Sequence, residues 1–132
     1  MKIWMNGCFD ILHYGHFSMI LHAQTLGNVI TIGIDSDDRV KKMKGENRPF
    51  HNQDQRKFNL RSIRGVDNVW TFNTDDELRN LIKAYSPDVF LIGSDYKNKP
   101  IIGSEFAKEI VFFDRLDDFS TTKILSYDNY NR

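Results

Sequence analysis

Two histidines lie three positions apart in a short segment near the start of the chain. From Gly7 to His16 the segment reads Gly-Cys-Phe-Asp-Ile-Leu-His-Tyr-Gly-His. Imidazole side chains can donate hydrogen bonds to phosphate oxygens without carrying a permanent charge. Gly7 has no side chain that would keep a ligand away from the backbone. His13 and His16, with Gly15 between them, are therefore candidate ligands for a chain of phosphates such as a triphosphate.

The same segment allows two other chemistries. Cys8, His13 and His16 could bind a metal ion, but no fourth ligand is evident and one glycine-containing turn would have to present all three. Cys8 could act as a nucleophile, but direct transfer between phosphates needs no covalent intermediate. Phosphate binding by the histidines is favoured, with Cys8 as a small core residue.

The hydrophobic pattern predicts strands that alternate with helices around this segment. The strands are expected at 2–6, 29–34, 68–72, 89–92 and 110–113, and the helices at 14–26, 52–64 and 74–85, with a closing helix that starts near Ser120. This alternation predicts an α/β fold with one Rossmann-like, doubly wound parallel sheet and helices on both faces. No linker or repeat divides the chain, so residues 1–132 are predicted to form a single domain.

A sheet of this kind binds ligands beyond the carboxyl ends of its strands. The segments expected at that edge are 7–16, 35–51, 93–103 and 114–123. His16 would then lie near a helix N-terminus, where free amides and the helix dipole favour an anion. Within 35–51, the residues from Lys41 to Pro49 are expected to form a charged loop.

Composition excludes several classes of partner. The chain has 18 basic and 18 acidic residues and a formal net charge of zero, whereas a general nucleic-acid binder normally carries a basic excess. A single cysteine excludes an internal disulfide. No stretch has the apolar length of a signal peptide or a membrane span. We therefore expect a cytoplasmic protein with neither nucleic acid nor membrane as partner.

Three motifs in order along the chain resemble one family. Gly7 to Asp10, followed by His13 to His16, is similar to the Gly-x-Phe-Asp and His-x-Gly-His signatures of the cytidylyltransferase-like nucleotidyltransferases. Gly93-Ser94-Asp95-Tyr96 resembles the Gly-x-Asp-aromatic loop of that family, and Arg115 with Ser120-Thr121-Thr122 resembles its closing motif. Together the motifs span nearly the whole chain.

The resemblance implies transfer of a nucleoside monophosphate from a nucleoside triphosphate to a phosphorylated small molecule. His13 and His16 would hold the phosphates and stabilise the transition state, Lys44 would close over the α-phosphate, and Arg115 would complete the catalytic group. The other expected nucleotide contacts are Gly7, Cys8, Phe9, Asp10, Gly15, Arg56, Arg64, Gly93, Asp95, Tyr96, Ser120, Thr121 and Thr122. Mg²⁺ is expected with the triphosphate, held mainly by phosphate oxygens and also by Asp10. The family further implies a homodimer, while His22 and His51 are interpreted as structural.

The resemblance divides over the substrates. The segments 44–49, 93–97 and 102–105 resemble the adenylyltransferase domain that makes ADP-heptose from heptose 1-phosphate, whereas Arg64 and Arg115 resemble glycerol-3-phosphate cytidylyltransferases. Because the arginines belong to the nucleotide side, CTP with a sugar- or polyol-phosphate acceptor is favoured. ATP with heptose 1-phosphate is the alternative. An inactive nucleotide-binding module is the hypothesis outside this class.

Overall fold

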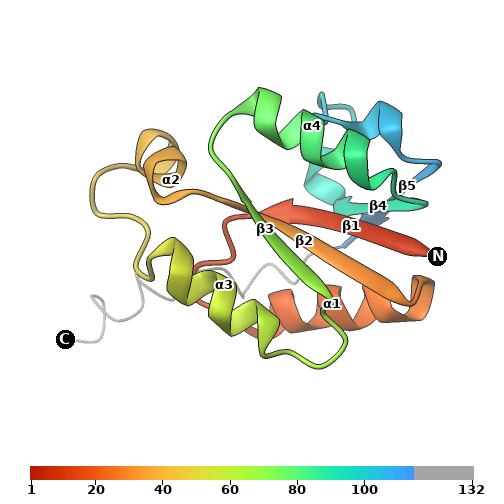
Figure 1. The fold of residues 1–132 in the computed structure, drawn as a ribbon, viewed down its shortest axis with the longest axis horizontal. Helices are drawn as coiled ribbons and strands as arrows, with labels where there is room; N and C mark the ends of the chain where they lie inside the picture. The colour runs from red at the N-terminus through yellow and green to blue at the C-terminus, as the bar shows by residue number, and fades with distance from the viewer. Residues whose placement is uncertain (115–132) are drawn as a thin grey trace.

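The protein is described from a computed structural model that places residues 1–114. These residues form one five-stranded sheet with the order β3-β2-β1-β4-β5, and every neighbouring pair of strands is parallel (Figure 1). The strands are β1 (Lys2–Gly7), β2 (Val29–Asp35), β3 (Asn68–Phe72), β4 (Val89–Gly93) and β5 (Glu109–Phe113). Starting from β1, the chain adds β2 and β3 on one side of the sheet and then β4 and β5 on the other side. This arrangement confirms the predicted doubly wound α/β fold.

Helices cover both faces of this sheet (Figure 1). One face carries α1 (Tyr14–Leu26) and α3 (Gln53–Arg61), and the other carries α4 (Asp75–Tyr85). A further helix, α2 (Asp37–Lys44), follows β2 at the carboxyl edge of the sheet, and short 3-10 turns occupy Ser94–Tyr96 and Ser104–Phe106. The carboxyl ends of β1 and β2 therefore open toward α2 and the start of α1.

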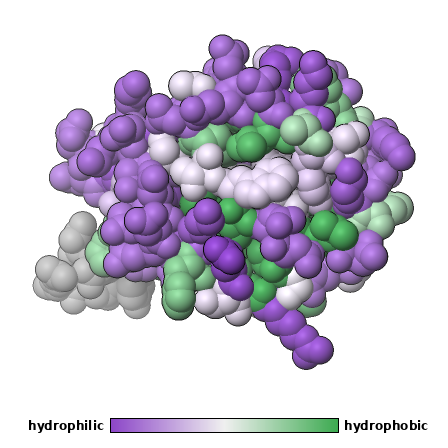
Figure 2. Space-filling model, in the orientation of Figure 1, coloured by the Kyte–Doolittle hydropathy of each residue, from purple (hydrophilic) through white to green (hydrophobic). Residues whose placement is uncertain are grey.

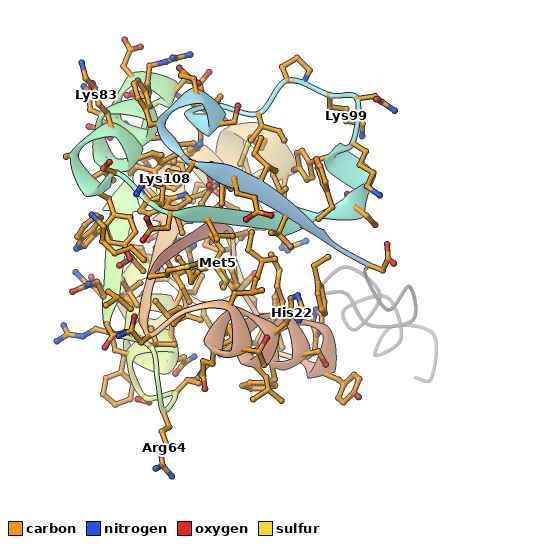
Figure 3. The ribbon with its side chains drawn as sticks, turned by 90° about the vertical axis from the view of Figure 1, so that its right-hand side faces the viewer. Met5, His22, Arg64, Lys83, Lys99 and Lys108 are labelled. Carbon is orange, nitrogen blue, oxygen red and sulfur yellow. The ribbon has the colours of Figure 1, made fainter. Side chains whose placement is uncertain are left out.

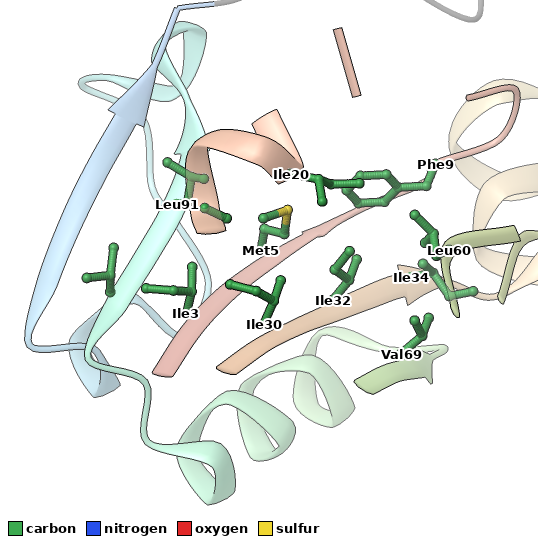
Figure 4. Packing of buried hydrophobic residues seen from close by; sticks show 12 residues of the cluster. Ile3, Met5, Phe9, Ile20, Ile30, Ile32, Ile34, Leu60, Val69 and Leu91 are labelled. Atoms are coloured by element: carbon green, nitrogen blue, oxygen red, sulfur yellow. The ribbon is translucent and has the colours of Figure 1, made fainter. Parts of the chain in front are cut away.

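Alternate residues of the central strands point to opposite faces of the sheet and belong to two separate hydrophobic clusters. Ile3 and Met5 of β1 point toward α1 and α3, where they pack with Ile20 and Leu60 (Figure 4). Trp4, between them in sequence, points to the opposite face and joins the cluster under α4. Both faces of β1 are thus buried, as expected for the central strand of a parallel sheet.

Helix α2 extends to Lys44 and so includes Lys41 to Lys44, which were expected to lie in a charged loop. Ser36 caps it, since its hydroxyl accepts a hydrogen bond from the Arg39 amide at 3.1 Å. Acidic Asp37 and Asp38 occupy the first turn and three lysines the last turn, so both ends complement the helix dipole. The charge order from acidic to basic was the signal for this helix, and only Val40 is buried.

Helix α3 ends earlier than the predicted Arg64. The amides of Ser62 and Ile63 turn back to carbonyls three positions earlier, which tightens the chain, and Gly65 follows with a φ of +92°. Arg64 therefore lies beyond the helix. Helix α1 ends at Leu26 as predicted, and Gly27 follows it in extended backbone with φ −163°. Its glycine is required because a Cβ there would lie 2.5 Å from the Met1 carbonyl oxygen.

Hydrophilic residues cover most of the face in Figure 2, and hydrophobic residues show mainly in the seams between the edge strand and the helices. Among residues 1–114, no helix has the length and apolarity needed to cross a membrane.

Candidate active site

The carboxyl edge of the sheet contains a cavity of about 500 Å³. It is lined by the last residue of every strand, namely Gly7, Asp35, Phe72, Gly93 and Phe113. Its volume lies in the range of small-molecule sites. Most of the site residues predicted from the sequence within residues 1–114 line this cavity, so the structure brings them together.

His13 and His16 cap helix α1 reciprocally. The His13 Nδ1 accepts a hydrogen bond from the Gly15 amide at 3.1 Å, and the His16 Nδ1 accepts one from the His13 amide at 3.3 Å. Their rings lie against each other, with centroids 3.9 Å apart, and Phe9 packs on His16 at 5.3 Å. Both histidines line the cavity. The two histidines therefore also have a structural role, because each ring accepts a hydrogen bond from a backbone amide at the helix start.

These cap bonds determine where the imidazole protons lie. A neutral ring that accepts at Nδ1 carries its proton on Nε2, so each histidine presents Nε2 as its donor. The sequence analysis assigned anion binding to free amides at the helix start as well. In the structure the Gly15 amide already donates to His13. At this helix end, hydrogen-bond donors for an anion are therefore supplied largely by the imidazole Nε2 atoms and less by backbone amides.

Asp10 joins the loop after β1 to the segment that precedes α3. Its carboxylate is 1% exposed and accepts the Phe50 amide at 2.7 Å and the His51 amide at 2.8 Å. The Arg48 Nε lies 3.4 Å from the same carboxylate. His51 adds a ring contact to the Asp10 carbonyl at 3.3 Å, which agrees with its interpretation as a structural residue. Both oxygens of Asp10 thus have backbone donors.

Arg56 is completely buried and stabilises the backbone of residues that line the cavity. Its guanidinium donates to three backbone carbonyls, those of Cys8 at 2.9 Å, Asp35 at 2.8 Å and His51 at 3.0 Å. It also bonds to the Asp37 carboxylate at 2.8 Å. The sequence predicts that Arg56 contacts the nucleotide. In the structure its donors are directed at the protein, where they fix the loops that follow β1 and β2.

Phe9 and Cys8 form the base of the site beside the histidines. Phe9 is buried in the core cluster and holds a φ of +50°, a left-handed conformation that is costly for a side chain of this size. Its ring contact with His16 compensates for part of that cost. Burial raises the pKa of the Cys8 thiol, although Lys44 and Arg56 oppose the effect. Cys8 is therefore kept as a neutral thiol, which agrees with its interpretation as a packing residue.

The remaining predicted contacts divide between the cavity and other places. Lys44, Gly93 and Tyr96 line the cavity, Lys44 from the last turn of α2 and Tyr96 from the turn after β4. Asp95 is exposed in that same turn and is not part of the cavity wall. Arg64 points into solvent, near the start of β3 and away from the carboxyl edge (Figure 3). Arg115, Ser120, Thr121 and Thr122 lie outside the described residues.

The cavity wall also contains an ion pair that was not predicted from the sequence. Asp35, the last residue of β2, bonds through its carboxylate to the Arg39 Nε at 2.8 Å. Both residues line the cavity. The separation of four positions across a helix start was the available signal, because such a spacing brings an acidic and a basic side chain together.

Comparison with known proteins identifies the family. A family model described as cytidylyltransferase-like matches residues 4–125. The chain belongs to the cytidylyltransferase-like family. This confirms the family predicted from the motifs, and with it membership of a group of nucleotidyltransferases.

Curated relatives of this nucleotidyltransferase chain are bifunctional proteins. It is 43% identical to Bifunctional protein HldE of Campylobacter fetus subsp. fetus over 124 residues, which cover 94% of this chain and 27% of that protein. It is 42% identical to Bifunctional protein HldE of Helicobacter hepaticus over 93% of this chain and 25% of that protein. The chain therefore spans about a quarter of the length of these relatives.

Solved structures share the fold of the cytidylyltransferase-like chain. A lipopolysaccharide core biosynthesis protein from Thermoplasma volcanium superposes with a TM-score of 0.70 at 21% identity, over 89% of this chain and 98% of that one. A protein of unknown function from Archaeoglobus fulgidus gives a TM-score of 0.63 at 20% identity, over 93% and 96% of the two chains. At these identities the likeness concerns the fold.

Proposed function

We propose that this chain transfers AMP from ATP to heptose 1-phosphate, with release of pyrophosphate. The observation that carries the proposal is the pair His13 and His16 at the cavity, which Lys44 also lines. The HldE relatives at 42–43% identity favour this sugar substrate over glycerol 3-phosphate. The sequence motifs alone favour CTP, with the heptose reaction as the alternative, and the relatives favour the opposite order.

The reaction proceeds by in-line displacement at the α-phosphorus. An oxygen of the acceptor phosphate forms the new bond to phosphorus, and the bond to the bridging oxygen of the β-phosphate breaks, so that pyrophosphate leaves with the electron pair. The attacking oxygen is already ionised, and no strong base is required. Rate enhancement then depends on positioning and on stabilisation of negative charge. The Nε2 donors of His13 and His16 and the Lys44 ammonium supply that stabilisation.

Mg²⁺ enters this proposal as part of the nucleotide substrate. Residues 1–114 contain no group of three His, Cys, Asp or Glu side chains that could hold a metal ion. Asp10 accepts two backbone amides, and Asp35 is paired with Arg39. The ion would therefore be held chiefly by phosphate oxygens, the coordination that Mg²⁺ prefers in nucleotide sites.

A substrate matrix tests the proposal. Purified protein with Mg²⁺ is incubated with ATP, CTP, GTP or UTP and with heptose 1-phosphate or glycerol 3-phosphate, and released pyrophosphate is measured. We expect release that depends on both ATP and heptose 1-phosphate. Release with CTP and glycerol 3-phosphate would reverse the substrate assignment. Tight nucleotide binding by calorimetry without turnover for any combination would instead favour an inactive binding module.

A further inference from the structure

A carboxylate stands in the wall of a cavity that is proposed to bind phosphates. Asp35 closes β2 beside the cavity, and its side chain is only 10% exposed. A buried negative charge so placed repels an incoming phosphate, because screening by water is weak there. Anion binding in this half of the cavity therefore requires a compensating positive charge.

Arg39 supplies that charge and is held at two points. Its Nε bonds to the Asp35 carboxylate and its Nη2 to the Asp75 carboxylate, both at 2.8 Å. The guanidinium also lies over the Phe72 ring, 5.2 Å from the centroid. The Arg39 side chain is 17% exposed, whereas Asp75 is 69% exposed. Asp35 is therefore the carboxylate whose charge must be balanced by Arg39. Asp75, which is exposed to solvent, serves mainly to hold the guanidinium in place.

The position of this pair assigns it to one half of the cavity. Gly93 ends β4 and Tyr96 follows it, and both are among the expected nucleotide contacts, whereas Asp35 and Phe72 end β2 and β3 on the other side of β1. Arg39 and Lys44 reach the cavity from the same short helix, α2. Lys44 is expected to close over the α-phosphate, the group that the acceptor phosphate must approach for transfer. The half of the cavity beside β2 and α2 is therefore where the acceptor phosphate would enter.

We propose that Arg39 is a positioning residue for the phosphate of the acceptor. It cancels the charge of Asp35, and its bonds to Asp35 and Asp75 hold α2 so that Lys44 stands over the cavity. The inference rests on the proposed function for the identity of the acceptor. Its chemistry, binding of a phosphate monoester beside a neutralised carboxylate, does not depend on which nucleotide is used.

Four variants separate the charge of Arg39 from its role in holding α2. Arg39→Gln leaves the Asp35 charge uncompensated, and Arg39→Gln combined with Asp35→Asn removes both charges. Asp75→Asn weakens only the outer contact of Arg39, and Arg61→Gln, at an exposed position of α3, is the matched control. For each, thermal denaturation establishes folding, calorimetry gives the Kd for ATP and for inorganic phosphate, and pyrophosphate release gives KM and kcat for heptose 1-phosphate.

Arg39→Gln is expected to weaken phosphate binding and raise the acceptor KM by roughly tenfold, the effect of one uncompensated charge at this range. The Kd for ATP should change by less than about twofold. The double variant should recover part of the loss, since the repelling charge is gone while the bonds that hold α2 stay absent. Arg61→Gln should behave as the parent protein.

Three results would overturn the inference: no phosphate binding to the parent protein, equal loss of ATP and phosphate affinity in Arg39→Gln, or no recovery in the double variant. Phosphate binding is read without turnover. A parent protein that binds phosphate but transfers no AMP would therefore count against the proposed function alone, while the comparison between Arg39→Gln and the double variant would still decide the role of Arg39.

Discussion

The Arg56 guanidinium donates a hydrogen bond to the Cys8 carbonyl at 2.9 Å, although 48 positions separate the two residues. The same Nη1 reaches the Asp35 carbonyl at 2.8 Å, so one nitrogen joins the loops that follow two adjacent strands. The spacing between the histidine-bearing loop and helix α2 is therefore set by a side chain that lies outside the cavity.

Replacement of Arg56 by Ala should destabilise the fold by about 3–5 kcal/mol, the usual cost of breaking a buried charged network. The reason is that three carbonyls and Asp37 lose their donor together. Urea denaturation measures this change, and Arg61→Ala, an exposed arginine on the same helix, should shift stability by less than about 0.5 kcal/mol. A variant of unchanged stability that has lost ATP affinity would restore the direct nucleotide contact predicted from the sequence.

Replacement of His16 by Ala should leave a folded protein with turnover reduced on the order of 10²–10³, the typical cost of one lost transition-state donor. Because His16 also bonds to the His13 amide, the midpoint of unfolding should fall by the equivalent of about 1 kcal/mol. Pyrophosphate release and denaturation measure the two effects. His22→Ala on the same helix is the control, and full activity in His16→Ala would refute the mechanism.

Asp10→Asn tests whether Asp10 binds the metal ion or the backbone. The substituted amide offers one acceptor oxygen where the carboxylate uses two, so stability should fall by about 1–3 kcal/mol. The Mg²⁺ concentration that gives half-maximal turnover should stay the same, because the ion is expected on the nucleotide. A several-fold rise in that concentration at unchanged stability would make Asp10 a metal ligand.

Cys8 should react slowly with iodoacetamide at pH 8. Burial raises the pKa of its thiol above the ordinary value of 9.0, so the reactive thiolate is scarcer than in a free cysteine at the same pH. The rate should therefore continue to rise as the pH passes 9, and saturating ATP should slow it further because Cys8 lines the cavity. Urea-unfolded protein serves as the reference for an ordinary thiol. Rapid labelling of the folded protein near pH 7 would contradict this environment for Cys8.

The architecture was predictable because its signals are local. The run from Val29 to Ile34 is apolar except for Thr31, which marks a strand buried on both faces, and Thr74 with Glu77 forms a capping box that marks the start of α4. His13 and His16 were found because their spacing and the neighbouring glycines have a chemical meaning for phosphate. In a parallel sheet, residues that directly follow the strands lie at its carboxyl edge, so the place of these histidines in the fold follows from the strand pattern.

The roles of the charged residues were harder to predict, because they depend on contacts between distant segments. An arginine on α3 has the same sequence signature whether it meets a ligand or buried carbonyls, and Arg56 meets the carbonyls. Asp10 meets amides 40 and 41 positions away. No local pattern encodes such pairings. Arg115 and the Ser120 to Thr122 motif lie beyond residue 114, and their roles stay predictions.

The reciprocal cap between His13 and His16 also limits how this site can change during evolution. Each ring serves both the helix start and the proposed chemistry, so a drift in either residue harms folding at the same moment as turnover. A lineage that abandoned the reaction would still need hydrogen-bond acceptors at these two positions. Serine, threonine or aspartate in place of His13, with glutamate or glutamine in place of His16, is the capping box to expect in relatives that have lost activity.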